Sequence, residues 1–265
     1  MLIMTKYLII LFGCLLGLTS STFNNGHIKK FKKGEKVKYR LHYGFITAGE
    51  ATISVNPNYT SRSGKNYFDL NIKGKSTGAF AKVMKINDHW RSLVDTNSLK
   101  PVLSYREIQE SRYYLKETVD FRTDIATVTS EKKDHIKKTK KHKIPSDVFD
   151  MVSAYYYLRN VDYKNLNVNE KIAVKAFFED KLYNFSIQYK GIESVKTKLG
   201  KIKAHKITPV MPGNELFDGE DSINIWLSAD KNQIPLKIKA KMFVGAVEIE
   251  IKSFEGLKHD LKIEN

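Results

Sequence analysis

Residues 146–159, SDVFDMVSAYYYLR, constrain the fold most, because they are the one convincing helical pattern in a chain that otherwise alternates like β-strands. Apolar residues recur here with the spacing of one helical face: Val148, Met151, Val152 and Tyr155. Ser146 and Asp147 supply an N-cap and a negative first turn. Other apolar and aromatic residues surround most of the circumference, so the pattern predicts a helix with protein packed on several sides.

The segments on both sides of this helix alternate between apolar and polar residues, as half-buried strands do. An early example has its apolar positions at Val37, Tyr39, Leu41 and Tyr43. Turn signals recur roughly every 8–12 residues, the spacing of a sandwich or barrel. We therefore predict a mainly β fold: a strongly curved antiparallel sheet or open β-barrel of roughly a dozen strands around one central α-helix.

The same patterns predict a single large domain. We expect a signal peptide at 1–22, a polar, mobile leader at 23–35, a β domain at 36–258 and a short tail at 259–265. Within the domain we expect a strand section at 36–130, a basic loop at 131–143, the helix at 146–159 and a second strand section at 171–254.

The N-terminus indicates export. Lys6 is followed by an apolar stretch, Tyr7–Leu18, and by the small polar residues Thr19–Thr22, the layout of a cleaved signal peptide. We expect a soluble protein in the periplasm of a Gram-negative bacterium. Cys14 leaves an alternative open, a lipoprotein anchored at that cysteine, although Phe12 fits the lipoprotein motif poorly.

The chain is strongly basic, with a formal net charge of +16, which favours anionic surroundings. Part of this charge lies in the run 131–143, at Lys137, Lys138, Lys140, Lys141 and Lys143. These lysines could dock on anionic lipid or on lipopolysaccharide phosphate, or they could simply cover a solvated loop or hairpin end. Nucleic acid is a poor partner, because the run lacks interleaved aromatic residues and the protein is expected outside the cytoplasm.

Three stretches together resemble a known bacterial family. They are Gly34-Glu35 with Tyr39–Gly44 and Ala48–Ala51, then Asp147–Arg159, and last Ile225–Asp230 with Pro235-Leu236. In this order they make the chain similar to the family catalogued as domain of unknown function 3108. The resemblance implies an exported protein of Gram-negative bacteria with no established activity. The strand-wrapped helix also resembles the half-barrel of periplasmic lipoprotein carriers, an analogy of fold that fixes no function.

Signals for catalysis or metal binding are weak. The seven histidines are scattered without metal-ligand spacing, and the chain has neither a nucleophile elbow nor a phosphate-binding loop. Remote carboxylates could still pair as in a glycosidase; the candidates are Asp88, Asp95, Glu107, Asp150 and Asp230. We predict no cofactor, no metal and no enzymatic activity, with a hydrolase as the less favoured alternative.

The tyrosine-rich helix is the better clue to a site. Tyr155, Tyr156 and Tyr157 could form the wall of a ligand groove with Asp150 and Trp226, or they could belong to the core. We predict that the protein binds an amphipathic ligand, such as a lipid, an acyl chain or a glycan. The alternative is a structural or assembly protein that binds another envelope protein. A cavity of a few hundred Å3 would favour the first, and a filled barrel with an exposed apolar patch would favour the second.

Overall fold

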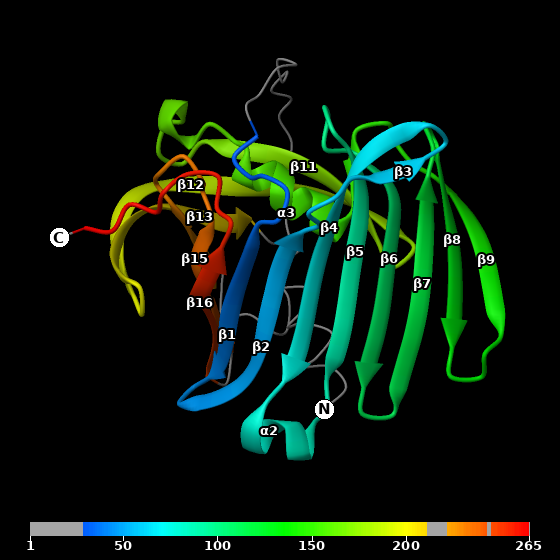
Figure 1. The fold of residues 1–265 in the computed structure, drawn as a ribbon, viewed down its shortest axis with the longest axis horizontal. Helices are drawn as coiled ribbons and strands as arrows, with labels where there is room; N and C mark the ends of the chain where they lie inside the picture. The colour runs from blue at the N-terminus through cyan, green and yellow to red at the C-terminus, as the bar shows by residue number, and fades with distance from the viewer. Residues whose placement is uncertain (1–28, 211–221, 243–244, 265) are drawn as a thin grey trace.

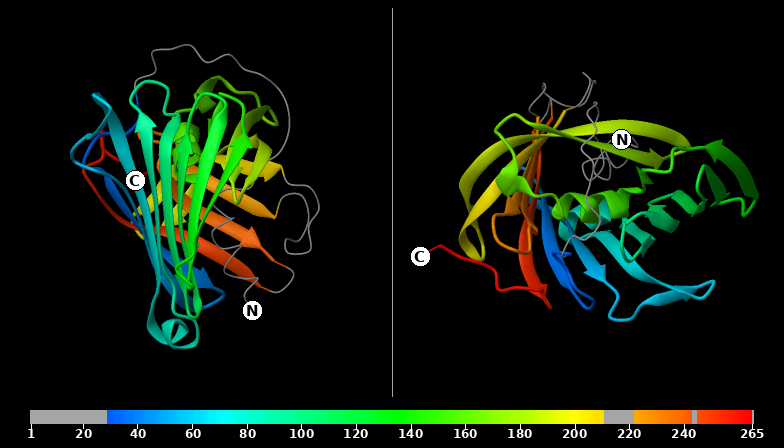
Figure 2. Two further views of the ribbon diagram at one scale, coloured as in Figure 1. Left: turned by 90° about the vertical axis from the view of Figure 1, so that its right-hand side faces the viewer. Right: turned by 90° about the horizontal axis from the view of Figure 1, so that it is seen from above.

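The structure, a computed structural model, describes residues 29–210, 222–242 and 245–264. Within these ranges one 16-stranded sheet curves around the helix α3 (Met151–Arg159), which lies on its concave side (Figures 1 and 2). The prediction of a mainly β, open, curved sheet around a single central helix is confirmed. The predicted signal peptide and Cys14 lie outside the described residues. No helix in the described ranges is long and apolar enough to cross a bilayer.

The first half of the sheet is an antiparallel meander, with a short helix, α2 (Gly78–Val83), between its fourth and fifth strands. Its strands are β1 (Lys36–Tyr43), β2 (Ile46–Val55), β3 (Thr60–Arg62), β4 (Lys65–Ser76), β5 (Asn87–Asp95), β6 (Pro101–Glu110), β7 (Tyr113–Phe121), β8 (Ile125–Lys132) and β9 (Lys137–Lys143). Alternate residues face inward, so that Val37, Ile53 and Leu70 enter one core.

The second half of the sheet begins with a short strand before α3 and continues after α3 and the 3₁₀ turn η1 (Tyr163–Asn165). Its strands are β10 (Val148–Phe149), β11 (Lys171–Phe178), β12 (Lys181–Thr197), β13 (Gly200–Val210), β14 (Ile223–Ser228), β15 (Pro235–Lys241) and β16 (Ala246–Glu255). β10 pairs in parallel with β11, and the later pairs are antiparallel.

The two halves join through the first and last strands. β1 pairs with β16 from Lys36↔Glu255 to Tyr43↔Val247, so the sheet is continuous through its middle. Its path ends at β10 on one side and at β9 on the other. Viewed from above, these two ends approach each other across α3 (Figure 2). The fold is therefore a barrel whose backbone ladder is not closed.

The helix begins later than predicted. Its N-cap is Asp150, and Ser146 and Asp147 precede the strand β10. Asp150 and Ser153 form a reciprocal capping box, in which Asp150 Oδ1 accepts from the Ser153 amide (2.9 Å) and Ser153 Oγ accepts from the Asp150 amide (2.9 Å). Val148 and Phe149 are thereby free to pair with β11. Asp150, one of the predicted groove residues, thus forms the N-cap of the helix.

The described parts of three segments predicted as loop, leader and tail make specific contacts. The predicted basic loop 131–143 contains the edge strand β9, paired along its length with β8, and lysine is a residue that protects such edges from pairing with other chains. In the predicted mobile leader, Phe31 is buried against Phe68 and Tyr156. The tail pairs through a bridge between Glu264 and Lys201. The contacts of Phe31 and Glu264 involve partners far away in the sequence, so composition alone does not reveal them.

Candidate functional site

The C-terminal end of α3 carries a buried ion pair. Arg159 Nη1 donates to Glu35 Oε1 (2.5 Å) and Nη2 donates to Oε2 (3.2 Å), and each side chain is only 1% exposed. Arg159 Nη2 also donates to the carbonyl oxygen of Asn232 (3.0 Å). Burial works against the charged guanidinium, but the charge of Glu35 keeps the pKa of Arg159 above its ordinary value. The pair fixes the helix to the segment that leads into β1.

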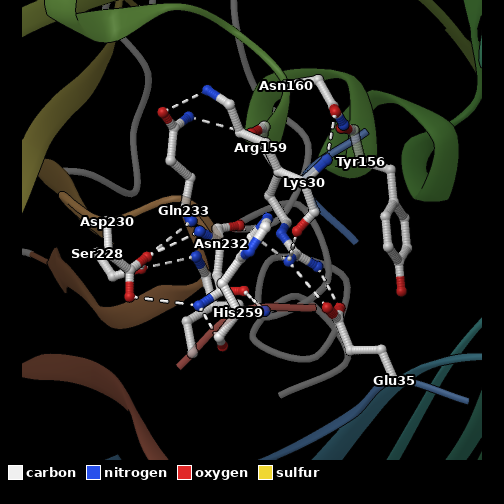
Figure 3. A network of polar contacts seen from close by, with 11 residues as sticks. Lys30, Glu35, Tyr156, Arg159, Asn160, Ser228, Asp230, Asn232, Gln233 and His259 are labelled. Atoms are coloured by element: carbon white, nitrogen blue, oxygen red, sulfur yellow. Dashed lines mark hydrogen bonds and ion pairs between the residues drawn. The ribbon is translucent and has the colours of Figure 1, made fainter. Parts of the chain in front are cut away.

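A glutamine and a lysine extend this contact (Figure 3). Gln233 Nε2 donates to the carbonyl oxygen of Arg159 (3.0 Å), a group that the helix end leaves unpaired, and to that of Val161 (2.9 Å) just beyond the helix. Lys30 Nζ donates to Gln233 Oε1 (2.5 Å). Burial lowers the pKa of Lys30 to about 8, while the charge of Asp162 acts in the opposite direction.

The turn after β14 completes the network. Asp230 accepts from Ser228 Oγ (2.8 Å) and from the Asn232 amide (2.9 Å). Asn232 Nδ2 donates to the carbonyl oxygen of His259 in the tail (2.9 Å). We call Lys30, Glu35, Arg159, Asp230, Asn232 and Gln233 the polar clamp. It brings together the three stretches on which the family resemblance rests, so these motifs hold the fold together at the end of the helix.

The aromatic residues of α3 lie in the core or pack against it. Tyr155 and Tyr156 are buried, and the Tyr156 ring lies edge-on to Phe31 at 4.7 Å. The Tyr156 hydroxyl has no hydrogen-bond partner among the described residues, and burial raises its pKa well above the ordinary value. Tyr157 packs on Phe149 with ring centroids 4.6 Å apart. These tyrosines therefore take part in core packing, which is the second of the two possibilities that the sequence left open.

The N-terminal end of α3 borders a small cavity of about 20 Å3, lined also by Trp90, Arg106 and Phe178. Asp150 lies at its edge, where Ser92 Oγ donates to Asp150 Oδ2 (2.5 Å). Burial raises the pKa of Asp150 to about 6, and these hydrogen bonds act against that rise. A cavity of this size has room for about one water molecule.

Next to the cavity, side chains close the gap between the two ends of the sheet. The guanidinium of Arg106 lies over the rings of Trp90 (5.4 Å) and Phe178 (4.8 Å). Its Nε donates to Glu117 Oε1 (2.7 Å), and its Nη1 is 3.6 Å from Glu179 Oε1. Arg106 therefore connects the first half of the sheet to the turn between β11 and β12.

The edge strand β9 reaches the same turn. Lys140 Nζ donates to Asp180 Oδ2 (2.6 Å), and His142 Nε2 lies 3.2 Å from Asp180 Oδ1. The His142 ring packs on Phe177 at 5.3 Å. We call the contacts of residues 177–180 with Arg106, Lys140 and His142 the seam. The barrel is closed here by side chains instead of backbone hydrogen bonds.

The predicted lysine patch is divided between two faces of β9. Paired residues of an antiparallel sheet share a face, and Lys140 is paired with the buried Val128, on the face toward the seam. Lys138 lies on that face as well, whereas the other three, Lys137, Lys141 and Lys143, lie on the opposite face. The five lysines are therefore not a single docking patch.

Trp226 is separated in the same way from the rest of the predicted groove. It is half-buried on β14, where Nε1 donates to Glu193 Oε1 (2.5 Å) and Lys206 lies over its ring. Of the five predicted groove residues, Asp150 alone lines the cavity at the N-terminal end of α3. Among the described residues, no group of three or more His, Cys, Asp or Glu side chains is placed to hold a metal ion.

Sequence reasoning identified neither Arg106 and Glu117 at the seam nor the ion pair that Arg159 forms in the polar clamp. Arg106 and Glu117 occupy positions where the alternation of β6 and β7 points side chains inward, and Arg159 is buried at the end of an apolar helix. A charged residue at an inward-facing position of a strand or helix could have indicated these sites, because a buried charge needs a partner. The partner is remote in the sequence, and no local sequence pattern identifies it.

Comparison with known proteins gives a family and a fold. A model of the family described as "Protein of unknown function (DUF3108)" matches residues 38–252. A β-barrel-like protein of domain of unknown function DUF1849 from Brucella abortus is 8% identical, with a TM-score of 0.55 over 84% of this chain and 98% of that chain. A structure described as a "putative lipoprotein" from Parabacteroides distasonis is also 8% identical, with a TM-score of 0.33 over 88% of this chain and 100% of that chain. No curated protein matches the sequence. The family match extends over most of the chain, and the protein belongs to the DUF3108 family.

Proposed function

We propose that this protein is a non-enzymatic component of the bacterial envelope that binds its partner on the outside of a filled half-barrel. The observation that carries the proposal is the packing of α3. Tyr155 and Tyr156 occupy the concave side of the sheet, where a carrier would need space for its ligand. Ligand sites typically enclose about 300–1,000 Å3, far more than the water-sized cavity beside Asp150.

Location in the envelope rests on the N-terminal sequence, which has the pattern of an export signal. The strongly basic composition agrees with surroundings rich in phosphate, such as lipid head groups. This reading corresponds to the structural or assembly role that the sequence left as the alternative.

Binding of an amphipathic ligand remains a second candidate because of the seam. Trp90 and Phe178 lie 5.6 Å apart beside the cavity, and they would form apolar walls if the seam opened. A hydrolase has less support. The carboxylates beside the cavity are already engaged: Asp150 with Ser92 and the helix amides, and Glu117 and Glu179 with Arg106.

Native mass spectrometry of residues 23–265, purified from a Gram-negative periplasm and accompanied by lipid extraction, tests the proposal. We expect the mass of the bare chain and no retained lipid or glycan. Trp90→Ala and Trp226→Ala are a matched pair, because they remove the two tryptophans of the chain, one beside the cavity and one away from it. A ligand that is lost from Trp90→Ala and retained by Trp226→Ala would replace our proposal with the carrier.

A further inference from the structure

One rim of the half-barrel is built from connections that lie side by side. The β1–β2 turn, α2 and the β6–β7 turn lie along the lower rim in Figure 1 and again at the bottom of the left view in Figure 2. Hydrogen bonds join them, from the Thr77 amide to the Ala48 carbonyl (3.1 Å) and from the Ser111 amide to the Lys85 carbonyl (2.7 Å). We call residues 44–46, 77–86 and 110–113 the lower rim.

The lower rim exposes large apolar side chains that the fold does not use. Phe45 is 106% exposed at the tip of the β1–β2 turn, Ile46 beside it is 55% exposed, and Val83 at the end of α2 is 73% exposed. Phe45 lies in a turn, Ile46 begins β2 and Val83 ends α2, so they are separate exposed side chains and not one flat patch. Exposed apolar residues grouped on one surface mark an interaction site.

Positive charge surrounds these side chains. Lys82 and Lys85 are exposed in the segment that forms and follows α2, and residues 77–86 contain no acidic residue. Arg112 is exposed in the adjacent turn, where Glu110 is the one carboxylate of the lower rim. Cations around an apolar tip are complementary to a surface that is anionic outside and apolar inside.

From this arrangement we infer that the lower rim docks on the anionic face of a lipid bilayer, with Phe45 and Val83 entering the acyl boundary and Lys82, Lys85 and Arg112 meeting phosphate. A bilayer accepts separate protruding side chains, whereas a protein partner would need a socket for each of them. The inference names the partner of the outer surface and so rests on the proposed function.

Co-sedimentation with lipid vesicles tests this inference on residues 23–265. We expect binding to vesicles of phosphatidylcholine mixed with phosphatidylglycerol, weaker binding to phosphatidylcholine alone, and loss of binding as salt increases. Phe45→Ser should lower the partition coefficient about tenfold, since a buried aromatic side chain is lost from the acyl boundary. Lys82→Gln should lower it about fivefold on anionic vesicles. Phe45→Trp should retain wild-type binding.

Matched controls come from the opposite rim, in the connection between α3 and β11 at the top of Figure 1. Val168 is 60% exposed and Lys164 is exposed, so Val168→Ser and Lys164→Gln remove similar side chains from a different surface. Both should bind vesicles like the wild type. Urea unfolding of all variants should be unchanged, because none of these side chains is in the core.

Two results would overturn the inference. One is a wild-type protein that does not bind anionic vesicles, and the other is a Phe45→Ser variant that binds them as well as Val168→Ser does. If Phe45→Ser instead abolishes cross-linking to an envelope protein while vesicle binding is intact, the lower rim is a protein interface. A lipid retained in native mass spectrometry would contradict the filled half-barrel and leave the vesicle result standing, so the two failures are distinguishable.

Discussion

Arg159 and Glu35 show what a single buried charge requires of its surroundings. Both are withdrawn from water, and the cost of that transfer is offset only because two bonds join them and the Asn232 carbonyl oxygen accepts a third. An apolar pair of the same volume could be equally stable. We therefore interpret the ion pair as fixing the orientation of α3, because its two hydrogen bonds form in only one position of the helix relative to the start of β1.

Removing one partner of this pair should be costly. Arg159→Met leaves Glu35 buried without its cation, and we expect the free energy of unfolding to fall by about 3–5 kcal/mol in urea titrations. The double variant Arg159→Met, Glu35→Leu should recover part of that loss. Glu255→Gln, which removes the exposed pairs with Lys36 and Lys38, serves as the control and should cost less than about 1 kcal/mol. An equal loss in both single variants would contradict a special role for the buried pair.

Asp88 gives a prediction for pH. Burial raises its pKa to about 7, while the bond from the Gln109 amide acts in the opposite direction. In the unfolded chain the Asp88 carboxyl has a pKa of 3.8, whereas in the folded protein it keeps its proton up to about pH 7. Asp88 therefore lowers the free energy of unfolding as the pH rises from about 4 to 7. Asp88→Asn should remove that dependence and be roughly 2–4 kcal/mol more stable than the wild type at pH 8, with little difference at pH 4.

Urea midpoints measured across this range give the comparison. His205 acts in the other direction, because burial lowers its pKa to about 4, so its contribution is lost as the pH falls from 6.5 toward 4. His205 is present in both proteins, and the difference between them isolates Asp88. A difference that does not change with pH would show that Asp88 is ionised in the folded state.

At the scale of elements, the turn between β11 and β12 has residues that do not favour its backbone conformation but that form ionic contacts with distant strands. Glu179 and Asp180 both have positive φ, 47° and 61°, in a two-residue turn that usually prefers Asn-Gly. Their carboxylates nevertheless meet Arg106, Lys140 and His142. The unfavourable backbone conformation occurs where the side chains of the turn close the barrel. We therefore interpret these two residues as serving the contacts of the seam.

Replacing the turn separates these two effects. The double variant Glu179→Asn, Asp180→Gly should leave β11 and β12 at least as well protected from hydrogen exchange, because the turn now has its preferred residues. The amides of β8 and β9 should exchange about tenfold faster or more, because the ionic contacts that hold the edge strand are lost. Asp180→Asn alone keeps the backbone preference similar and should show the same effect on β9 in weaker form. Unchanged exchange in β9 would mean that the seam does not hold the edge.

For the whole molecule, the sequence allowed the architecture to be predicted but not the long-range contacts that stabilise it. Alternation in Val37–Tyr43 and the helical stripe around Val152 have periods that belong to one element each, so both could be read locally. Pairing of β1 with β16 joins residues more than two hundred positions apart, and no local period encodes it. The start of the helix was misplaced because Ser146 and Asp150 are both good caps, and the choice depends on β10 finding β11.

The candidate sites follow the same division. The motif residues Glu35, Arg159 and Asp230 were visible in the sequence, but their meeting in the polar clamp required the fold. Phe45 follows a glycine, and nothing in the sequence distinguishes an apolar residue that projects into solvent from one that folds back onto the sheet. Exposure is a property of the whole chain, so the lower rim could be recognised only in the structure.

The position of β16 beside β1 also sets the order in which the molecule can form. A chain that emerges N-terminus first presents β1 with one edge unpaired until the last strand has emerged, so the middle of the sheet is the final part to assemble. Such distant pairing makes folding slow, because a very long loop must close before its contacts are gained. The ladder at the centre of the sheet therefore cannot form before the whole chain is available, although the meander β1–β9 pairs locally.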